Sequence, residues 1–365
     1  MMQSSFDPNA RHIDPIRVRN LRVDVRSSGN FVVEDFNLDL RPGEVVGLVG
    51  ESGSGKTTAG LALLGYARPG LTISKGSVNI DGVEILKLSG PAMLEARRKL
   101  VSYVPQDPSA ALNPALRIRT QLAEKLSVRS DVRDSDLVPF LREVMLPATG
   151  DFLNKFPHEM SGGQQQRVGI AMAFASRPRL IVMDEPTTGL DVTTQAHVLK
   201  TVESLCSEHQ VACLYVSHDL AVVAGIAQRV AVMYSGRVVE IGPTQEVLFR
   251  PEHPYTRALI RAVPSMKAQS AMHGIPGQAP DVAHRPTGCS FSDRCDLAIE
   301  RCHEAFPAEV KITPEHTIRC WNFAGAAATL DRERTREMPR SSGHVLLDVR
   351  NLSASYAEKE VLHDL

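Results

Sequence analysis

The sequence predicts an α/β domain built on a largely parallel sheet. Strand-like and helical segments alternate over residues 15–250, which is the pattern of such a domain. Short apolar runs end in polar residues, as buried parallel strands do where their carboxyl ends carry chemistry: residues 44–50 (EVVGLVG), 179–184 (RLIVMD) and 212–218 (ACLYVSH). Between about 90 and 175 the strand signals stop and helical periodicity dominates, which predicts an inserted helical subdomain.

The first predicted element is a hairpin, and its shape returns at the end of the sequence. Residues 15–40 run from an apolar strand through a polar turn into a second apolar strand, which predicts an N-terminal antiparallel β subdomain. Residues 345–365 have the same shape, and both segments contain Val-Arg-Asn-Leu, at 18–21 and at 349–352. We expect the second hairpin to be poorly anchored, because an isolated two-stranded unit is marginal in water.

Length and charge limit the possible functions. At 365 residues the chain exceeds one typical core, so we expect two domains or a domain with an appendage. Its 41 Lys and Arg nearly balance its 42 Asp and Glu, which gives no electrostatic case for a nucleic-acid surface. No apolar run approaches the length of a membrane span, and the first residues lack the apolar core of a signal peptide. We therefore expect a cytoplasmic chain.

Residues 50–57 (GESGSGKT) match the phosphate-loop pattern G-x-x-x-x-G-K-[ST], between a predicted strand and a predicted helix. Glycines let successive N–H groups converge on a phosphate, and the helix N-terminus adds a favourable dipole. We expect Lys56 to bridge the β- and γ-phosphates and the Thr57 hydroxyl to take one Mg²⁺ position. A plain glycine-rich turn is disfavoured, because the flanking elements agree with the loop. The predicted residues are Gly50, Glu51, Ser52, Gly53, Ser54, Gly55, Lys56, Thr57 and Thr58.

Two adjacent carboxylates end the predicted strand at 179–184. Successive strand residues point to opposite faces, so Asp184 and Glu185 can take different roles. We expect Asp184 to hold Mg²⁺ through water and Glu185 to polarise the attacking water as general base. An Asp-Glu pair at a strand end is common by itself, but much less so beside a phosphate loop.

Three further stretches complete a motif set: YVPQDP at 103–108, SGGQQQR at 161–167 and YVSHDL at 215–220. With the phosphate loop and DEPTTGLD, their order and spacing resemble the motifs of ABC-transporter ATPase domains. The resemblance covers roughly residues 15–325. It implies that ATP and Mg²⁺ are bound and that the core is a P-loop NTPase of the ABC type.

The resemblance also implies roles for single residues. Gln106 would sense Mg²⁺ and the attacking water, and His218 would contact the γ-phosphate and hold Glu185 in place. Asp191 would lie where two such domains meet. The helix that opens with Ser161, Gly162, Gly163 and Gln164 would bind the γ-phosphate held by another domain's phosphate loop. Hydrolysis should therefore require a face-to-face pair with ATP between the two domains.

Longer matches indicate a branch of this family. QDPSAALNP at 106–114, FPHEMSGGQQQR at 156–167 and HPYTRALIRAVP at 253–264 resemble the ATP-binding subunits of oligopeptide, dipeptide and nickel importers. That resemblance implies a motor for uptake of peptides or a similar solute, peripheral on the cytoplasmic face of the membrane. Its partners would be two transmembrane permeases, a second ABC ATPase domain and, indirectly, an extracytoplasmic solute-binding protein, and no nucleic acid. The alternative is a soluble ABC ATPase acting on nucleic acid or ribosomes, but neither a long heptad run nor a basic block supports it.

Changes in composition set the expected domain boundaries. The sequence becomes rich in Gly, Pro and Cys after about 250, and residues 323–343 are small or charged. The expected units are a nucleotide-binding domain at 1–265 with its helical subdomain at about 92–175, a Cys-containing extension at 266–325, a linker at 326–343, and the truncated start of a second nucleotide-binding domain at 344–365.

One position departs from the family pattern. Members usually offer an aromatic ring to adenine near the end of the first strand, and here that place holds Val25. Phe31 is a possible substitute from the next strand. In the C-terminal hairpin the corresponding place holds Tyr356, which we expect to serve the adenine site of the second domain.

Four of the six cysteines lie in the extension: Cys289, Cys295, Cys302 and Cys320. A reducing compartment disfavours disulfides, and the spacing lacks the close pair that structural zinc prefers. Iron–sulfur clusters tolerate more varied spacings. Importers with such a tail hold a [4Fe–4S] cluster there, so the resemblance favours a cluster over zinc and over unligated thiols.

Overall fold

The computed structural model describes residues 14–107, 112–126, 132–263, 274–323, 348–356 and 359–362. From residue 354 onward it describes the backbone alone. Within these residues no helix is both long and apolar enough to cross a membrane.

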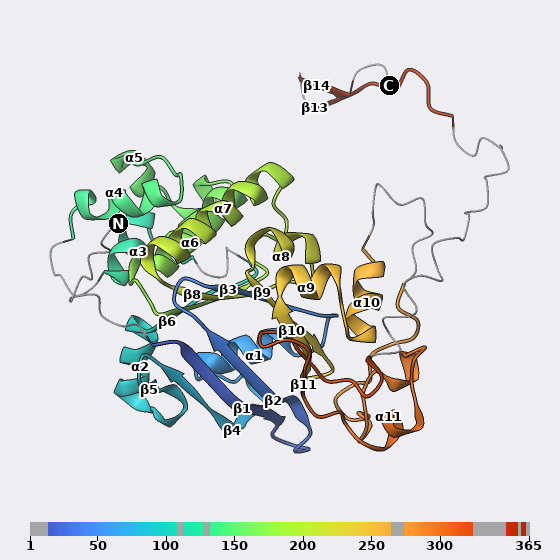
Figure 1. The fold of residues 1–365 in the computed structure, drawn as a ribbon. Helices are drawn as coiled ribbons and strands as arrows, with labels where there is room; N and C mark the ends of the chain where they lie inside the picture. The colour runs from blue at the N-terminus through green and yellow to red at the C-terminus, as the bar shows by residue number, and fades with distance from the viewer. Residues whose placement is uncertain are drawn as a thin grey trace, which may run out of the picture.

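A mixed sheet of eight strands forms the centre of the molecule (Figure 1), in the order β11-β12-β10-β9-β3-β8-β7-β6. The three predicted strands are confirmed as β3, β8 and β7, which pair in parallel as neighbours. The strands are β3 (Val45–Val49), β6 (Val101–Val104), β7 (Leu180–Asp184), β8 (Ala212–Val216), β9 (Arg229–Tyr234), β10 (Arg237–Pro243), β11 (Val310–Lys311) and β12 (Thr317–Ile318).

Both faces of the central sheet are buried, so the parallel strands are apolar throughout. In β3, Val45 and Val49 face one hydrophobic cluster, while Val46 and Leu48 face a second. Helix α1 (Lys56–Leu63) lies in the second cluster, packed closely on β7, since a Cβ at Gly60 would lie 2.9 Å from a methyl group of Val182. This alternation of side chains explains why the sequence shows continuous apolar runs rather than a polar face.

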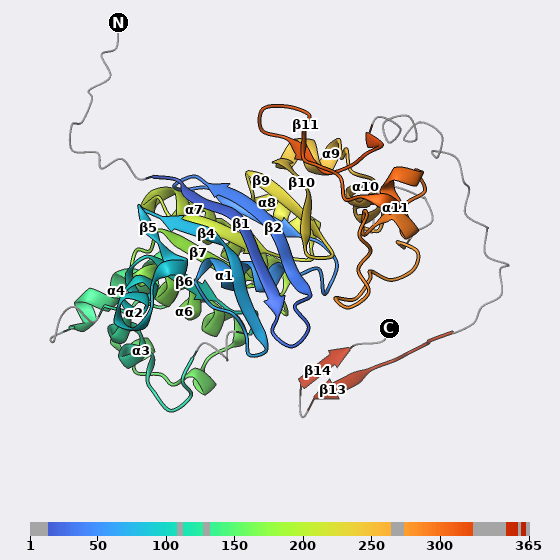
Figure 2. The same cartoon turned by 90° about the horizontal axis from the view of Figure 1, so that it is seen from below.

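A second sheet of four antiparallel strands covers α1 (Figure 2), in the order β2-β1-β4-β5, which confirms the predicted β subdomain. Its first two strands form the predicted hairpin and pair from Ile16 with Leu40 to Asp24 with Phe31. The strands are β1 (Ile16–Val25), β2 (Phe31–Leu40), β4 (Leu71–Ile80) and β5 (Val83–Glu84).

The segment from 90 to 175 is mostly helical, as predicted, but it contains one strand that the sequence did not reveal. Strand β6, Val101–Val104, pairs in parallel with β7 at the edge of the central sheet. Only its two ends are buried, so four residues leave no apolar run to recognise. The helices here are α2 (Gly90–Lys99), α3 (Ile118–Lys125), α4 (Asp134–Glu143), α5 (Gly150–Leu153), α6 (Gly162–Ala175) and the 3₁₀ turn η3 (Pro157–Glu159).

The remaining helices follow the central strands and the extension. They are the 3₁₀ turn η1 (Ile85–Lys87), α7 (Val192–His209), α8 (Leu220–Ile226), α9 (Thr244–Phe249), α10 (Pro254–Arg261), the 3₁₀ turn η4 (Ser292–Arg294) and α11 (Glu300–Glu304).

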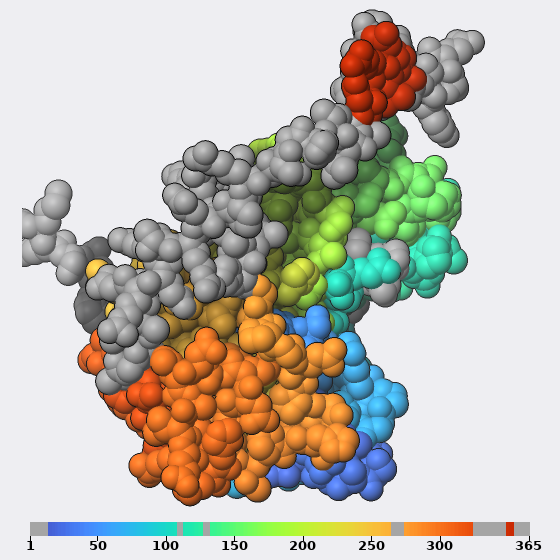
Figure 3. All heavy atoms as spheres, turned by 90° about the vertical axis from the view of Figure 1, so that its right-hand side faces the viewer, coloured from blue at the N-terminus to red at the C-terminus, as the bar shows by residue number. Residues whose placement is uncertain are grey.

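The extension is joined to the core by strand pairing. Its strands β11 and β12 continue the central sheet through β10, with Glu240 opposite Ile318. Figure 3 shows the extension, in orange, lying against the N-terminal strands in blue. The extension therefore contacts both sheets.

The C-terminal segment forms a hairpin, β13 (Ala354–Tyr356) and β14 (Lys359–Leu362), which pairs with no other strand in the described part of the chain. The resemblance to the first hairpin extends to the backbone. The asparagine of Val-Arg-Asn-Leu has a positive φ in both copies, 47° at Asn20 and 54° at Asn351. Asparagine tolerates this left-handed region better than most residues. That the hairpin begins a second domain remains a prediction.

A buried ion pair lies where the extension meets the core. The ring of His316 is bound on both sides, with Nε2 2.8 Å from Glu240 and Nδ1 3.1 Å from Glu246. Burial by itself lowers the pKa of His316, but the hydrogen bond and the charge of Glu240, together with Glu246, outweigh it and raise the pKa overall. His253, which packs nearby, is instead kept neutral, because burial lowers its pKa to about 4.

We predict that stability falls as the pH rises from about 6.5 to 8. Since the folded pKa of His316 is raised, its contribution is fully present below the unfolded value near 6.5 and is lost above it. His253 is neutral in the folded chain throughout this window. Its partial protonation in the unfolded chain at about pH 6.5, and the ionisation of unfolded thiols toward about pH 8.5, are common to the unaltered chain and to His316→Gln. Thermal unfolding midpoints measured across the window should decline in the unaltered chain and lose this slope in His316→Gln. An equal slope in both proteins would contradict the assignment.

Candidate functional site

The predicted phosphate loop lies between β3 and α1, and its glycines are required by the backbone. Gly50, Gly53 and Gly55 have φ values of 149°, 77° and 99°. A Cβ at Gly50 would lie 2.1 Å from the backbone oxygen of Met233, so no other residue fits there. The loop is thus wound tightly against strand β9 before helix α1 begins.

The inner surface of the loop suits an anion. Among the described residues, the N–H groups of Gly53 and Gly55 have no protein acceptor. The Ser54 hydroxyl is buried and equally without a protein partner. The Ser54 hydroxyl needs a partner because buried polar groups are normally hydrogen-bonded. Together with the two N–H groups, it fits a phosphate group held by the loop. Thr58 lies in the first turn of α1, behind the loop.

Lys56 is held over the loop by two backbone carbonyls. Its Nζ donates to the oxygen of Gly50 at 2.8 Å and to that of Glu51 at 2.9 Å. Burial lowers the pKa of Lys56, and the carboxylates of Glu185, Asp184 and Glu51 oppose that shift. The ammonium group is therefore fixed close to both predicted carboxylates.

Asp184 ends strand β7 and receives two hydroxyl hydrogen bonds. Thr57 Oγ1 donates to its Oδ1 at 3.0 Å, so the two residues expected to hold Mg²⁺ lie side by side. Tyr103 donates to Oδ2 at 3.1 Å from the end of β6. The sequence analysis missed Tyr103; its position in YVPQDP, three residues before Gln106, was the available signal. Hard oxygen ligands of this kind suit Mg²⁺.

Glu185 contacts both of the other residues predicted to be catalytic, His218 and Gln106. His218 Nδ1 lies 2.8 Å from its Oε1, and Gln106 Nε2 donates to its Oε2 at 3.2 Å. Its backbone has a φ of 48°, a left-handed conformation that is uncommon for glutamate and that turns the chain away from β7. The N–H of Glu185 donates to Val216 at 2.9 Å, which ties this turn to the end of β8.

The predicted SGGQ segment and Asp191 lie at helix N-termini. Ser161 caps α6, accepting from the Gln164 N–H at 3.3 Å while its own N–H donates to the Gln164 side chain at 3.1 Å. Asp191 caps α7, and its hydrogen bond with Thr194 lowers its pKa. In the described residues, no hydrogen bond or ion pair links 161–164 to the phosphate loop of the same chain. Whether Gly162 and Gly163 bind nucleotide remains a prediction.

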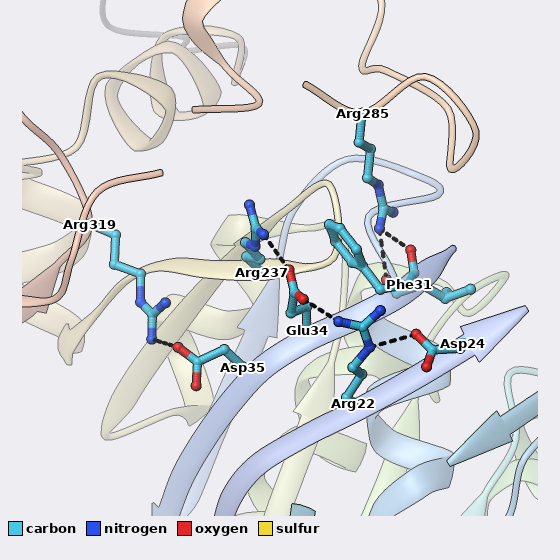
Figure 4. Close-up of polar contacts among 9 residues, drawn as sticks. Arg22, Asp24, Phe31, Glu34, Asp35, Arg237, Arg285 and Arg319 are labelled. Atoms are coloured by element: carbon cyan, nitrogen blue, oxygen red, sulfur yellow. Dashed lines mark hydrogen bonds and ion pairs between the residues drawn. The ribbon is translucent and has the colours of Figure 1, made fainter. Parts of the chain in front are cut away.

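Phe31 packs against two arginines, and its contact with adenine remains a prediction. The guanidinium groups of Arg285 and Arg237 lie 4.5 and 4.8 Å from its ring centroid. Figure 4 shows Arg285 also reaching the Phe31 carbonyl, and Glu34 accepting from Arg22 and Arg237. The same close-up shows Arg319 pairing with Asp35, at 2.6 Å. These contacts join the extension to the antiparallel sheet.

Arg22, Arg237 and Arg319 line an open cavity of about 290 Å³. Of the arginines that line it, Arg22 and Arg237 are paired with Glu34, and Arg319 with Asp35. The cavity therefore belongs to the contact between the extension and the core. It lies apart from the residues that surround Glu185.

The extension also reaches the phosphate loop. Arg294 binds the Glu51 carboxylate through both terminal nitrogens, at 2.8 and 2.9 Å, and the Tyr255 hydroxyl accepts the Glu51 N–H at 2.9 Å. Neither residue was predicted. Each is more than 200 positions from Glu51, being 243 and 204 residues away, so no local pattern could have indicated the contact.

The four cysteines of the extension do not form a metal site as the structure describes them. Within the described ranges, no group of three or more His, Cys, Asp or Glu residues is arranged to hold a metal. Burial raises the pKa of Cys289 to about 11 and that of Cys320 to about 12, and charges on the neighbouring thiols add to both shifts. The expected cluster thus gains no support from the arrangement of its residues.

Two family models match the chain. Residues 33–188 match the model described as ABC transporter, and residues 239–302 match the oligopeptide/dipeptide transporter C-terminal region. The second match contains Tyr255, Arg294 and three of the four cysteines.

Relatives match most of the chain. The oligopeptide transport ATP-binding protein OppD of Escherichia coli is 40% identical over 313 residues, which cover 84% of this chain and 92% of the relative. OppD of Salmonella typhimurium is 40% identical over 301 residues, covering 80% and 90%. Among solved structures, a dimeric ATP-binding cassette in a post-hydrolysis state with ADP and phosphate superimposes with a TM-score of 0.55 at 26% identity, covering 63% of this chain and 98% of that one.

Proposed function

The chain belongs to the ABC transporter ATP-binding proteins, and from that membership we propose that it is the ATP-hydrolysing subunit of an importer of peptides. The observation that carries the proposal is the grouping of Gln106, Glu185 and His218 beside a complete phosphate loop. The substrate class comes from the oligopeptide transport relatives, because the residues of an ATP site do not contact the transported solute.

The phosphate loop and its neighbours bind the nucleotide. Backbone N–H groups of residues 53–57 and the ammonium of Lys56 would hold the phosphates. Thr57 and Asp184 would hold Mg²⁺, which neutralises charge on the β- and γ-phosphates when bound. Tyr103 fixes the Asp184 carboxylate by donating to the oxygen that Thr57 does not use.

Glu185 acts as general base toward the attacking water. Its two carboxylate oxygens are held by different residues, His218 and Gln106, so its orientation is set before any substrate arrives. His218 and Gln106 thus position the base, and each is exposed enough to meet a phosphate or a partner surface.

A second ATPase domain would complete the site. The support is that the exposed N-terminus of α6, which begins after Ser161, makes no bond to the phosphate loop of its own chain, while its free N–H groups suit a γ-phosphate. The second domain would be either fused downstream of residue 365 or a separate chain. Asp191 would then lie at the meeting surface of the two domains.

Two membrane-embedded permeases would convert ATP-driven closure of the paired domains into transport. The chain would lie on the cytoplasmic face of the membrane, and an extracytoplasmic solute-binding protein would deliver the solute to the permeases. The oligopeptide transport relatives favour this arrangement over a soluble ATPase acting on nucleic acid or ribosomes.

We predict that Glu185→Gln keeps ATP binding but lowers the steady-state ATPase rate by about 100-fold or more, because the general base is lost. ATP binding and hydrolysis should be measured on the same preparation. Glu203→Gln, at an exposed carboxylate on α7, is the matched control and should leave both unchanged. Undiminished turnover in Glu185→Gln would show that another group is the base.

Removal of the Tyr103 hydroxyl should weaken Mg²⁺ binding. In Tyr103→Phe the Asp184 carboxylate loses a hydrogen bond that orients it, so the half-saturating Mg²⁺ concentration for hydrolysis should rise about tenfold. The half-exposed Tyr66 provides a control in Tyr66→Phe. If both variants need the same Mg²⁺ concentration as the unaltered chain, Tyr103 has no part in the metal site.

A [4Fe–4S] cluster held by Cys289, Cys295, Cys302 and Cys320 is a separate proposal. Its support is that the match to the oligopeptide/dipeptide transporter C-terminal region contains three of the four cysteines. No step of hydrolysis depends on it. Anaerobically purified protein should contain about four iron atoms and four labile sulfides per chain. Stoichiometric zinc, or neither metal, would refute the cluster.

A further inference from the structure

Every polar group of Glu51, the second residue of the phosphate loop, is bound by the protein. The carboxylate receives both terminal nitrogens of Arg294, and the N–H donates to Tyr255. The backbone oxygen accepts from Lys56 Nζ at 2.9 Å and from the Ser54 N–H at 3.2 Å. Glu51 thus links the C-terminal part of the chain to the lysine that faces the phosphates.

Arg294 and Tyr255 are themselves held in one rigid group of side chains. Tyr255, Tyr234 and Phe291 form an aromatic cluster with ring centroids 4.5 to 5.3 Å apart. Arg294 lies on the edge of this cluster, donates to the Tyr234 hydroxyl at 3.0 Å and donates through Nε to the Pro276 carbonyl at 2.7 Å. With 7% of its side chain exposed, the guanidinium group has little freedom to leave Glu51.

The charge of this pair matters because the loop binds an anion. Arg294 neutralises Glu51, whose side chain is only 26% exposed. Without the arginine, a half-buried carboxylate would stand unpaired beside the site that receives a triphosphate. Removal of one partner of such a pair is costly mainly because it leaves the other charge uncompensated.

We propose that Arg294, from the docked C-terminal extension, and Tyr255, on α10, are positioning residues for ATP binding: they hold Glu51 and set the geometry and charge of the phosphate loop. The inference rests on the proposed function, since it takes the loop to be the ATP site. It adds a regulatory consequence: a ligand or partner that draws Arg294 away from Glu51 weakens the affinity of the loop for ATP.

The chain offers a matched control for a purely structural role. Arg319 also comes from the extension, and its side chain is similarly buried, with 12% of its surface exposed. It pairs with a core carboxylate, Asp35, at 2.6 Å. Its guanidinium group binds Asp35 on the antiparallel sheet (Figure 4), and none of its hydrogen bonds or ion pairs among the described residues goes to the phosphate loop. If arginines of the extension act only by attaching it, both substitutions should have the same effect on ATP.

The test compares Mg²⁺-dependent ATP binding and hydrolysis by the full chain and its variants. Arg294→Met should weaken ATP binding roughly tenfold, which is within the range usual for coupled sites. The KM for ATP should rise, while kcat at saturating ATP should change less than about twofold. Arg294→Lys keeps the charge but loses the bidentate contact, so its effect should be intermediate. Arg319→Met should lower the unfolding midpoint but leave the affinity for ATP unchanged.

Two further variants keep the test decisive if Arg294→Met folds poorly. Tyr255→Phe removes only the acceptor of the Glu51 N–H and should weaken ATP binding several-fold, near the roughly fivefold lower end of that range. The double variant Glu51→Gln with Arg294→Met leaves no unpaired charge and should recover ATP affinity to within about threefold of the unaltered chain.

The outcomes separate this inference from the proposed function. Equal losses of ATP affinity in Arg294→Met and Arg319→Met would overturn it, because Arg294 would then act only by attaching the extension. No recovery in the double variant would overturn the part assigned to charge. Failure of the unaltered chain to bind ATP would overturn the proposed function itself, and this inference with it.

Discussion

The whole site depends on the parallel pairing of β3, β8 and β7. Because the three strands run in the same direction, their carboxyl ends meet at one edge of the sheet. The phosphate loop follows β3, His218 follows β8, and Asp184 with Glu185 ends β7. Residues separated by more than 100 positions therefore bond directly, as Thr57 does with Asp184 across 127 residues.

Both faces of this sheet are packed, and each packing layer helps to hold that edge in place. One face packs on α1 and the antiparallel sheet, and the other on the helices from α6 to α9. Since both faces are buried, the strands cannot shift their register without exposing apolar side chains to water. Glu185, the proposed general base, keeps an uncommon left-handed backbone because β7 and β8 fix its neighbours.

The sequence was sufficient to predict those parts of the structure that depend on a local residue pattern. The three apolar strands, the phosphate loop and the carboxylate pair were all predicted, because each needs a particular residue order within a few positions. Strand β6 was not, since half of its four residues are only partly buried at the sheet edge. Arg294 and Tyr255 were not, because their contacts with Glu51 depend on how the chain after residue 250 folds back on the phosphate loop.

The central claim is that the edge formed by these strands binds a nucleotide and its metal. The most direct measurement is a crystal structure of the chain with Mn²⁺ and a non-hydrolysable ATP analogue, with the metal located by anomalous scattering. The account predicts Mn²⁺ bound by the Thr57 hydroxyl next to Asp184, and phosphates on the N–H groups of residues 53–57. A metal ion held elsewhere, or a nucleotide away from Lys56, would contradict it.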